Sequence, residues 1–230
     1  MPFNRRSLVP FRFLTSLIAI LLLNISISDN IYSSVATVKA RHNVWNVPGL
    51  SPQVFELALR AADTAQAQQV TGSNILGIID YSLPSTARRF WVLDLETRRV
   101  LFHEFVAHGR GSGDTYATSF SNKAQSYKSS LGLFITESTY RGKHDLSLRL
   151  HGLEPGINDN ARSRAIVIHG AWYVDEGMIS KQGRMGRSLG CPSVKESVAR
   201  PLIDTLKDGN LIFAYYPDDH WLSTSKFLNR

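Results

Sequence analysis

The chain has 230 residues, 43% of them hydrophobic, with a formal net charge of +7 and one cysteine, Cys191. A single cysteine excludes a disulfide framework within the chain, and no paired-ligand spacing for a metal accompanies it. The positive charge is spread along the sequence without a basic block interleaved with aromatic residues, so nucleic acid is not an expected partner.

The first forty residues have the pattern of an export signal. Arg5, Arg6 and Arg12 form a basic region, and the almost wholly apolar run 13–27 follows it. That run is shorter and more interrupted than a comfortable membrane span. We expect residues 1–40 to be a signal peptide or, alternatively, an uncleaved N-terminal anchor. The remainder is expected to be exported, and the lack of a lipoprotein cysteine or a sorting motif favours a periplasm.

Residues 41–74 are expected to form an N-terminal helical segment. Ser51 and Pro52 fit an N-cap followed by proline at the first helical position, and apolar residues then recur at helical spacing to about Gln69. The chain from 75 to 220 has the size of one ordinary domain, and 221–230 is expected to be a C-terminal tail.

From residue 75 the pattern changes to β. A hairpin through 96–99 is expected, and Ser193 with Glu196 forms an S-x-x-E capping box that predicts a helix, kinked at Pro201, to Gly209. The fold class is therefore mainly β with short α+β margins, a sandwich or a barrel-like sheet. The candidate strands are 75–80, 90–95, 100–107, 131–136, 146–150, 165–169 and 211–216.

Cys191 lies in the stretch GRSLGCPSV, residues 186–194, between a glycine and a proline. These neighbours indicate an irregular, tightly turned backbone. In an oxidising compartment an unpaired cysteine indicates a reactive thiol, although a buried cysteine can also serve as a small hydrophobe. A cysteine nucleophile needs a base, a partner that orients the base, and donors for the oxyanion.

His169 is the expected base because it ends the most strongly apolar strand candidate, 22 residues before Cys191. The Gly170 carbonyl is accessible to the imidazole and would fix its tautomer. Gly190 permits unusual backbone angles, so its N–H is an expected oxyanion donor, and Ser188 offers a nearby hydroxyl. The alternatives are a structural strand-end histidine and an ordinary loop serine.

These stretches resemble a known family. HGAWY at 169–173 and GRSLGCPSV at 186–194 resemble the signature of the L,D-transpeptidases of the YkuD fold. SFSN (119–122), SSLGLF (129–134), TYRGKH (139–144) and RAIVIHG (164–170) are similar to its murein L,D-transpeptidase catalytic domain subfamily. The resemblance spans about 100–216 and implies a YkuD-like β-sandwich in which Cys191 is the nucleophile, His169 its base and Gly170 the orienting position.

Two departures from the commonest family pattern stand next to the cysteine. Leu189 occupies the place of a second histidine, and Pro192-Ser193-Val194 follows where an apolar residue and then Arg or Asn are usual. A leucine cannot hydrogen-bond a substrate carboxylate, so details of the substrate pocket are not transferred from the commoner pattern.

The resemblance implies acyl transfer on peptidoglycan stem peptides without cofactor or metal. The Cys191 thiolate, expected to form below the ordinary thiol pKa of about 8.5, would release D-alanine, and a second stem's amine would resolve the thioester into a cross-link. Alternatives are an L,D-carboxypeptidase that uses water, and a non-catalytic envelope-binding module. Arg187 is a candidate partner for a stem carboxylate, and Tyr140, with 141, 142 and His144, is a candidate lid. Contact with a membrane is expected only through a retained N-terminal segment.

Overall fold

The structure is a computed structural model, and it describes residues 45–229. The expected export signal at 1–40 lies outside the described residues. From Val47 onward the chain forms one compact unit. Among the described residues, no helix is both long and apolar enough to span a bilayer.

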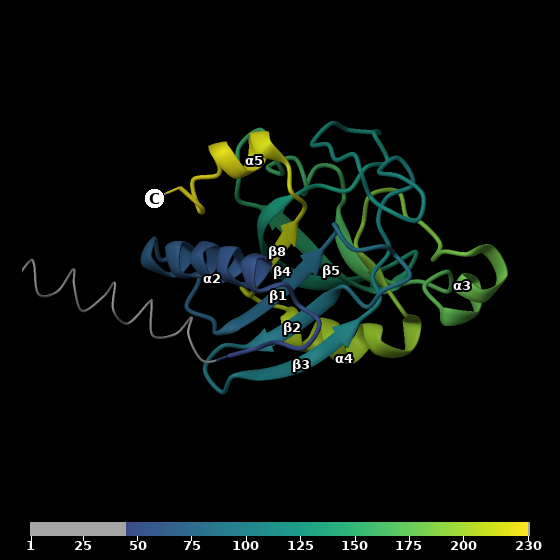
Figure 1. The fold of residues 1–230 in the computed structure, drawn as a ribbon, viewed down its shortest axis with the longest axis horizontal. Coiled ribbons are helices and arrows are strands. Elements are labelled where there is room, and N and C mark those ends of the chain that lie inside the picture. The colour runs from purple at the N-terminus through teal and green to yellow at the C-terminus, as the bar shows by residue number, and fades with distance from the viewer. Residues whose placement is uncertain (1–44, 230) are drawn as a thin grey trace, which may run out of the picture. The chain divides into compact units, whose positions relative to one another are not determined.

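Eight strands form one mixed sheet in the order β3-β2-β1-β8-β4-β5-β6-β7 (Figure 1). The mainly β prediction is confirmed, but the strands share a single sheet, and the expected sandwich is not confirmed. All seven predicted strands are present, with ends shifted by a few residues in most of them. The strands are β1 (Ile75–Asp80), β2 (Phe90–Asp94), β3 (Arg99–Glu104), β4 (Gly132–Gly142), β5 (Asp145–Gly152), β6 (Val167–Gly170), β7 (Ser193–Val194) and β8 (Leu211–Tyr215).

The sheet is nearly closed on itself. β3 and β7 are its two edge strands, but Ala107, just beyond β3, forms an antiparallel bridge to Ser193 in β7. The Ala107 N–H donates to the Ser193 carbonyl at 2.8 Å. This closure brings the chain that follows β3 against the strand that follows Cys191.

The helices cover the sheet and its margins. The predicted N-terminal helix is confirmed and packs on β1 and β8, while the helix after β7 packs on β5, β6 and β1 (Figure 1). β1 and β8 are buried at nearly every position, which requires cover on both faces. The helices are α2 (Pro52–Ala67), α3 (Glu176–Gln182), α4 (Glu196–Leu206) and α5 (Asp219–Thr224).

The predicted capping box before α4 is wrong. The N-cap of α4 is Lys195, which makes no side-chain cap, and Ser193 belongs to β7 instead. Pro201 does lie within the helix, which ends at Leu206 rather than Gly209. The Ser193 hydroxyl is therefore available for another partner.

The β4–β5 hairpin is longer than predicted. β4 continues to Gly142 past a register shift between Thr136 and Thr139, and β5 begins at Asp145. Because β5 also pairs with β6, placing Ser147 opposite His169, the tip of this hairpin lies over the end of β6.

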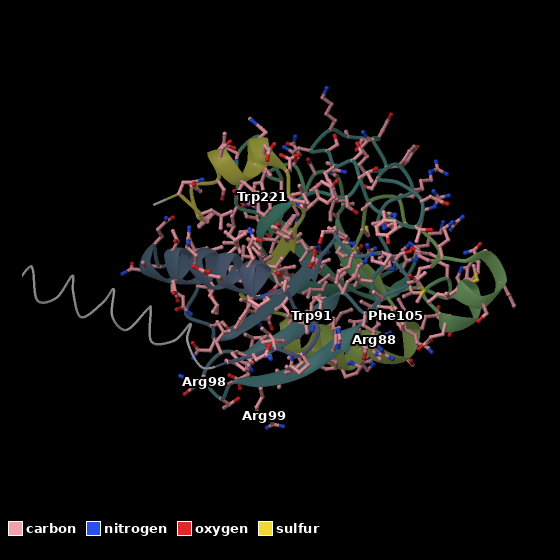
Figure 2. All side chains as sticks on the ribbon, viewed as in Figure 1. Arg88, Trp91, Arg98, Arg99, Phe105 and Trp221 are labelled. Carbon is pink, nitrogen blue, oxygen red and sulfur yellow. The ribbon has the colours of Figure 1, made fainter. Side chains whose placement is uncertain are left out.

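The C-terminal residues pack on the domain rather than forming a free tail. Trp221 is 1% exposed, and its indole N–H lies 3.2 Å from the carboxylate of the buried Glu154 (Figure 2). Phe227 and Leu228 are also buried. The described part of the segment expected as a tail thus contributes to the core.

Candidate active site

His169 is the penultimate residue of β6 and is buried, with 2% of its surface exposed. Its Nδ1 lies 2.8 Å from the Gly170 carbonyl oxygen, which can only accept a hydrogen bond. Nδ1 therefore carries the proton and Nε2 carries the free lone pair. Burial lowers the pKa of His169 to about 4, so the imidazole is neutral at physiological pH.

The Nε2 lone pair of His169 is directed at Ser193. The parallel pairing of β6 and β7 sets these residues side by side, with Nε2 2.9 Å from the Ser193 Oγ. The Tyr173 hydroxyl lies 3.0 Å from the same Oγ. Sequence reasoning assigned Ser193 to a helix cap, so it missed this chain of hydroxyls.

Cys191 lies two residues before Ser193, in the loop that leads into β7, and is partly exposed. Its Sγ lies 3.6 Å from the Ala165 carbonyl oxygen, a long contact for a thiol donor. Burial raises the pKa of the thiol, while a backbone hydrogen bond at Val167 and the nearby Arg164 oppose the rise. The resting site thus holds a protonated thiol beside a neutral imidazole, and the expected lowering of the thiol pKa is not found.

His169 lies on β6, which pairs with β7, and Cys191 lies two residues before Ser193 of β7. Among the hydrogen bonds of residues 45–229, none joins the Cys191 and His169 side chains. In the parallel register His169 is level with Ser193, whereas the Cys191 thiol meets the chain at Ala165, before β6 begins. The expected direct contact between base and nucleophile is therefore replaced by the His169–Ser193 contact.

Ser188 and Gly190 hold the shape of the cysteine loop. The Ser188 Oγ donates to the Cys191 carbonyl at 2.6 Å and accepts from the Gly190 N–H at 3.1 Å. Gly190 has φ +127°, as its predicted unusual backbone requires. In this conformation the Gly190 N–H already has a partner and is not free to bind an oxyanion.

Arg187 and Tyr140 have partners away from the thiol. The Arg187 guanidinium donates to the Gly113 carbonyl at 2.9 Å and pairs with Asp114 at 3.3 Å. The Tyr140 ring lies under the Arg149 guanidinium, 4.2 Å from its centroid. Their expected contacts with substrate remain predictions.

His144 is the residue of the predicted lid that reaches the site. It lies in the turn between β4 and β5, and its ring stacks on His169 with centroids 4.1 Å apart and planes 23° from parallel. The hairpin tip thus covers the outer face of the expected base. The turn-rich sequence TYRGKH gave the only signal for this contact.

A groove of about 600 Å³ opens beside the end of β6. Its walls come from the hairpin tip, from the segment after Gly170 and from the first turns of α4. Trp172, which is 70% exposed, stands in one wall. The charged and aromatic lining comprises Lys143, His144, Asp145, Trp172, Tyr173, Glu196 and Arg200.

Arg164 supports the site and was missed from the sequence. Its guanidinium donates to the carbonyls of Ser121 and Lys128, each at 2.6 Å, and so fixes the segment that packs behind Gly190. Its charge also opposes the burial effect on the pKa of Cys191. A lone arginine before an apolar strand carries no sequence signal for this role.

Through His108, another arginine, Arg89, supports the loop that carries Cys191. Arg89 is 0% exposed and donates to Leu83 O at 2.7 Å, to Val106 O at 3.0 Å and to the His108 Nδ1 at 2.8 Å. The His108 carbonyl in turn accepts the Ser188 N–H at 2.9 Å. Burial and the adjacent guanidinium lower the pKa of His108 to about 4. This cluster connects β2 to the cysteine loop.

Within residues 45–229, no three His, Cys, Asp or Glu side chains converge in a way that could hold a metal ion. The described site offers a thiol, an imidazole and hydroxyl groups near a polar groove. These are the groups of a thiol acyltransferase or hydrolase.

The family of the chain follows from a match to the L,D-transpeptidase catalytic domain (YkuD_2), which covers residues 46–215. Because the match extends over most of the sequence, the chain belongs to this family. A search of curated proteins gives no match.

Several solved structures are similar to this chain at low identity. An L,D-transpeptidase from Mycobacterium smegmatis is 16% identical over 63% of this chain and 60% of its own, with a TM-score of 0.39. L,D-transpeptidase 3 from Mycobacterium tuberculosis is 15% identical over 63% and 62%, with a TM-score of 0.39. The helical cell shape determining protein Pgp2 from Campylobacter jejuni is 11% identical over 69% and 57%, with a TM-score of 0.40. The chain thus spans about three fifths of the length of these proteins.

Proposed function

We propose that this protein is an exported, most simply periplasmic, L,D-transpeptidase that uses Cys191 as its nucleophile and His169 as the base. Membership of the L,D-transpeptidase family supports the reaction class. The observation that carries the assignment of roles is the neutral, buried His169, whose unprotonated Nε2 can take up a proton, on the strand that pairs with β7, which begins two residues after the only cysteine of the sequence.

The proposed reaction begins with loss of the thiol proton from Cys191. The thiolate attacks the amide between the L-centre of a diamino acid and the terminal D-alanine of a stem peptide. The tetrahedral intermediate collapses, D-alanine leaves with a proton returned from the imidazolium, and a thioester remains. The amine of a second stem then attacks the thioester, regenerates the thiol and forms the cross-link.

The groove beside β6 supports a peptide substrate that carries both charge signs. Lys143 and Arg200 offer cations for stem carboxylates, and Glu196 offers an anion for an amine. Trp172 presents an exposed aromatic face to the chain of such a peptide. A stem peptide with several carboxylates and a free amine has the matching chemistry.

The test is mass spectrometry of defined tetrapeptide muropeptides incubated with the purified protein and with Cys191→Ser. The wild type is expected to release D-alanine and form a cross-linked dimer, whereas the variant should lose more than ~10³-fold in turnover, since a hydroxyl needs far stronger activation. A carbapenem should add covalently to the wild type only. Wild-type turnover in folded Cys191→Ser would overturn the proposal.

The second candidate is an L,D-carboxypeptidase that shares all steps up to the thioester. The partial exposure of Cys191 supports this candidate, because water can reach an acyl group on the thiol. Release of D-alanine without any dimer, at high acceptor concentration, would assign the hydrolytic reaction. An envelope-binding module would show neither product and would leave Cys191 unreactive toward thiol reagents near neutral pH.

A further inference from the structure

The hydrogen bonds around Ser193 have a fixed direction. The Gly170 carbonyl only accepts, so His169 is protonated on Nδ1 and its Nε2 is an acceptor. Ser193 must therefore donate its single proton to Nε2. With that proton used, Ser193 Oγ accepts from the Tyr173 hydroxyl. The chain thus runs from Tyr173 through Ser193 to His169.

Burial excludes Ser193 as the nucleophile. The residue is 0% exposed, whereas Cys191 is partly exposed. A hydroxyl enclosed between the imidazole and the Tyr173 phenol has no path for a carbonyl group to reach it. The geometry resembles that of a serine activated by histidine, but the accessible nucleophile is the thiol two residues earlier.

We propose that Ser193 carries the proton between the Cys191 thiol and His169, with Tyr173 as a positioning residue for the Ser193 hydroxyl. This inference rests on the proposed function for the identity of the nucleophile. Cys191 and Ser193 are two residues apart, roughly 7 Å between Cα atoms in an extended chain. In the resting structure the thiol contacts the Ala165 carbonyl at 3.6 Å, and the relay requires the thiol to turn from that carbonyl to the Ser193 Oγ.

The proton balance of the step is simple. The S–H bond of Cys191 breaks and its proton passes to the Ser193 Oγ, while the O–H proton of Ser193 passes to Nε2 of His169. The products are a thiolate, an unchanged serine hydroxyl and an imidazolium. When the D-alanine amine leaves, the imidazolium returns a proton by the reverse path or directly.

The charged and titratable groups around the relay come from four segments. His144 stacks on His169 from the β4–β5 turn, and Tyr173 approaches from the loop after β6. Arg164, which precedes β6, and Tyr81, which follows β1, interact electrostatically with Cys191. A thiol and a neutral base that are coupled react at a rate independent of pH between their two pKa values, because their joint protonation state does not change there.

The test is the pH profile of iodoacetamide alkylation of Cys191 in the full-length protein. In the wild type we expect a plateau between about pH 5 and pH 8, from the relay. In Ser193→Ala and in His169→Ala only free thiolate reacts, so the rate should fall about tenfold for each unit of pH below the thiol pKa. The double variant should show no further loss, as expected for two residues that act as one unit.

Ser85→Ala is the matched control. Ser85 is also a buried serine, 1% exposed, and its Oγ has no hydrogen-bond partner among residues 45–229. The control should keep the wild-type plateau. A plateau retained in folded Ser193→Ala, or one lost equally in Ser85→Ala, would overturn the relay.

Two further measurements keep the proposal testable. If Ser193→Ala does not fold, Tyr173→Phe is the alternative, because it removes only the donor to Ser193. It should lower the rate at the plateau about threefold without changing the pH limits of the plateau, which corresponds to the loss of one neutral hydrogen bond. An unchanged plateau would count against the relay. Alkylation needs no peptidoglycan, so a Ser193-dependent plateau without D-alanine release would keep the relay and reject the transpeptidase. Normal D-alanine release by Ser193→Ala would instead keep the transpeptidase and reject the relay.

Discussion

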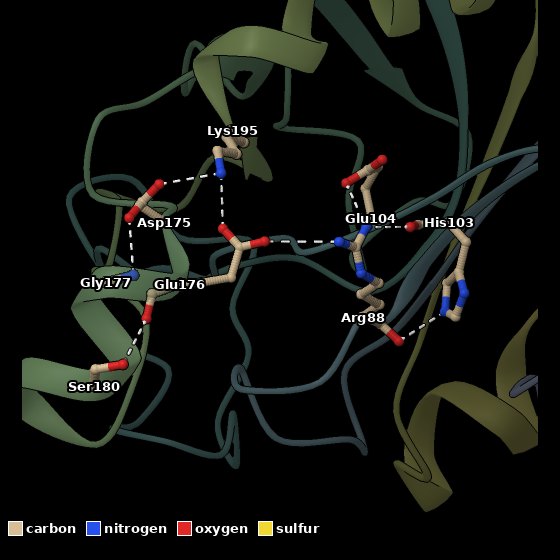
Figure 3. A network of polar contacts seen from close by, with 8 residues as sticks. All are labelled: Arg88, His103, Glu104, Asp175, Glu176, Gly177, Ser180 and Lys195. Atoms are coloured by element: carbon tan, nitrogen blue, oxygen red, sulfur yellow. Dashed lines mark hydrogen bonds and ion pairs between the residues drawn. The ribbon is translucent and has the colours of Figure 1, made fainter.

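Two adjacent arginines, Arg88 and Arg89, belong to polar regions with opposite surroundings. Arg88 is 44% exposed and pairs with Glu104 at 3.1 Å and with Glu176 at 3.6 Å (Figure 3). Arg89 is 0% exposed and donates to two carbonyls and an imidazole behind the cysteine loop. Successive side chains before a strand point to opposite faces, so one residue step separates solvent from the core.

The exposed network continues through α3 to the end of β7. Glu176 accepts from Lys195 at 2.8 Å, and Lys195 also pairs with Asp175 at 3.2 Å (Figure 3). Arg88 additionally lies over the Phe105 ring, 4.9 Å from its centroid (Figure 2). Lys195 is only two residues beyond Ser193, so both regions end on the same strand. The two regions differ in their access to water. Water can replace a lost partner in the exposed network around Arg88, but not in the buried cluster around Arg89.

The sharpest test of this comparison is the matched pair Arg89→Met and Arg88→Met. We expect Arg89→Met to lower the free energy of unfolding by about 3 kcal/mol or more, because it leaves buried acceptors unpaired. Arg88→Met should cost at most ~1 kcal/mol, since its partners remain hydrated. Urea denaturation of both variants measures the difference, and equal losses would contradict the assignment of Arg89 as the support of the loop.

The second-largest effect is expected from acid, which should lower the free energy of unfolding through the buried histidines. His169 and His108 have folded-state pKa values of about 4, below the unfolded value of about 6.5. The unfolded chain therefore binds more protons between these values, and stability falls as pH drops through this window. From pH 6.5 to 4.5 the loss should be on the order of 2 kcal/mol for each histidine.

The control for the acid prediction is His108→Asn, which keeps an acceptor for Arg89 but does not titrate. Its stability should change with pH about half as steeply as that of the wild type. A pH dependence equal to that of the wild type would show that His108 is not one of the groups responsible.

A smaller effect is expected for Gly190→Ala. Its φ of +127° suits glycine, and an added Cβ would lie 2.9 Å from the Lys128 carbonyl oxygen. We expect a loss of about 1–3 kcal/mol and slower alkylation of Cys191. Gly183→Ala is the comparison, because Gly183 has φ +73° with no atom near the added Cβ; if thermal denaturation shows the same loss in both variants, crowding at Gly190 is not the cause.

The smallest effect should come from Glu176→Gln, which removes the carboxylate at the centre of the exposed network. Both of its ion pairs are with side chains at least 38% exposed. We expect a change in the melting temperature close to the error of the measurement, vanishing at high salt. A large, salt-independent loss would mean that α3 is held by this network rather than by its apolar contacts.

The sequence predicted the strands well because each has a local signature. The runs beginning at 75, 90, 100, 131, 165 and 211 contain β-branched or aromatic residues, and the run from 146 alternates leucine with polar residues. The two-residue β7 has no such signature, and its parallel pairing with β6 is set by contacts distant in sequence.

Only the site residues that belong to a recognisable sequence motif could be predicted. His169, Gly170 and Cys191 stood out, but Ser193 followed the S-x-x-E spacing of a helix cap as closely as that of any site. A hydroxyl donates equally well to a backbone group or to an imidazole, so the choice depends on register. The sequence could not show which of Arg88 and Arg89 is buried. Two adjacent arginines differ only in the face of the chain on which each side chain lies, and the sequence does not say which face packs on the core.

The bridge between Ala107 and Ser193 has a consequence for how copies of the protein behave together. β7 is the last strand of the sheet, and an open edge there would offer unpaired backbone groups to another chain. The Ala107 N–H occupies the Ser193 carbonyl on that edge. The strand next to the thiol thereby offers one fewer unpaired carbonyl for edge-to-edge pairing with another copy of the chain.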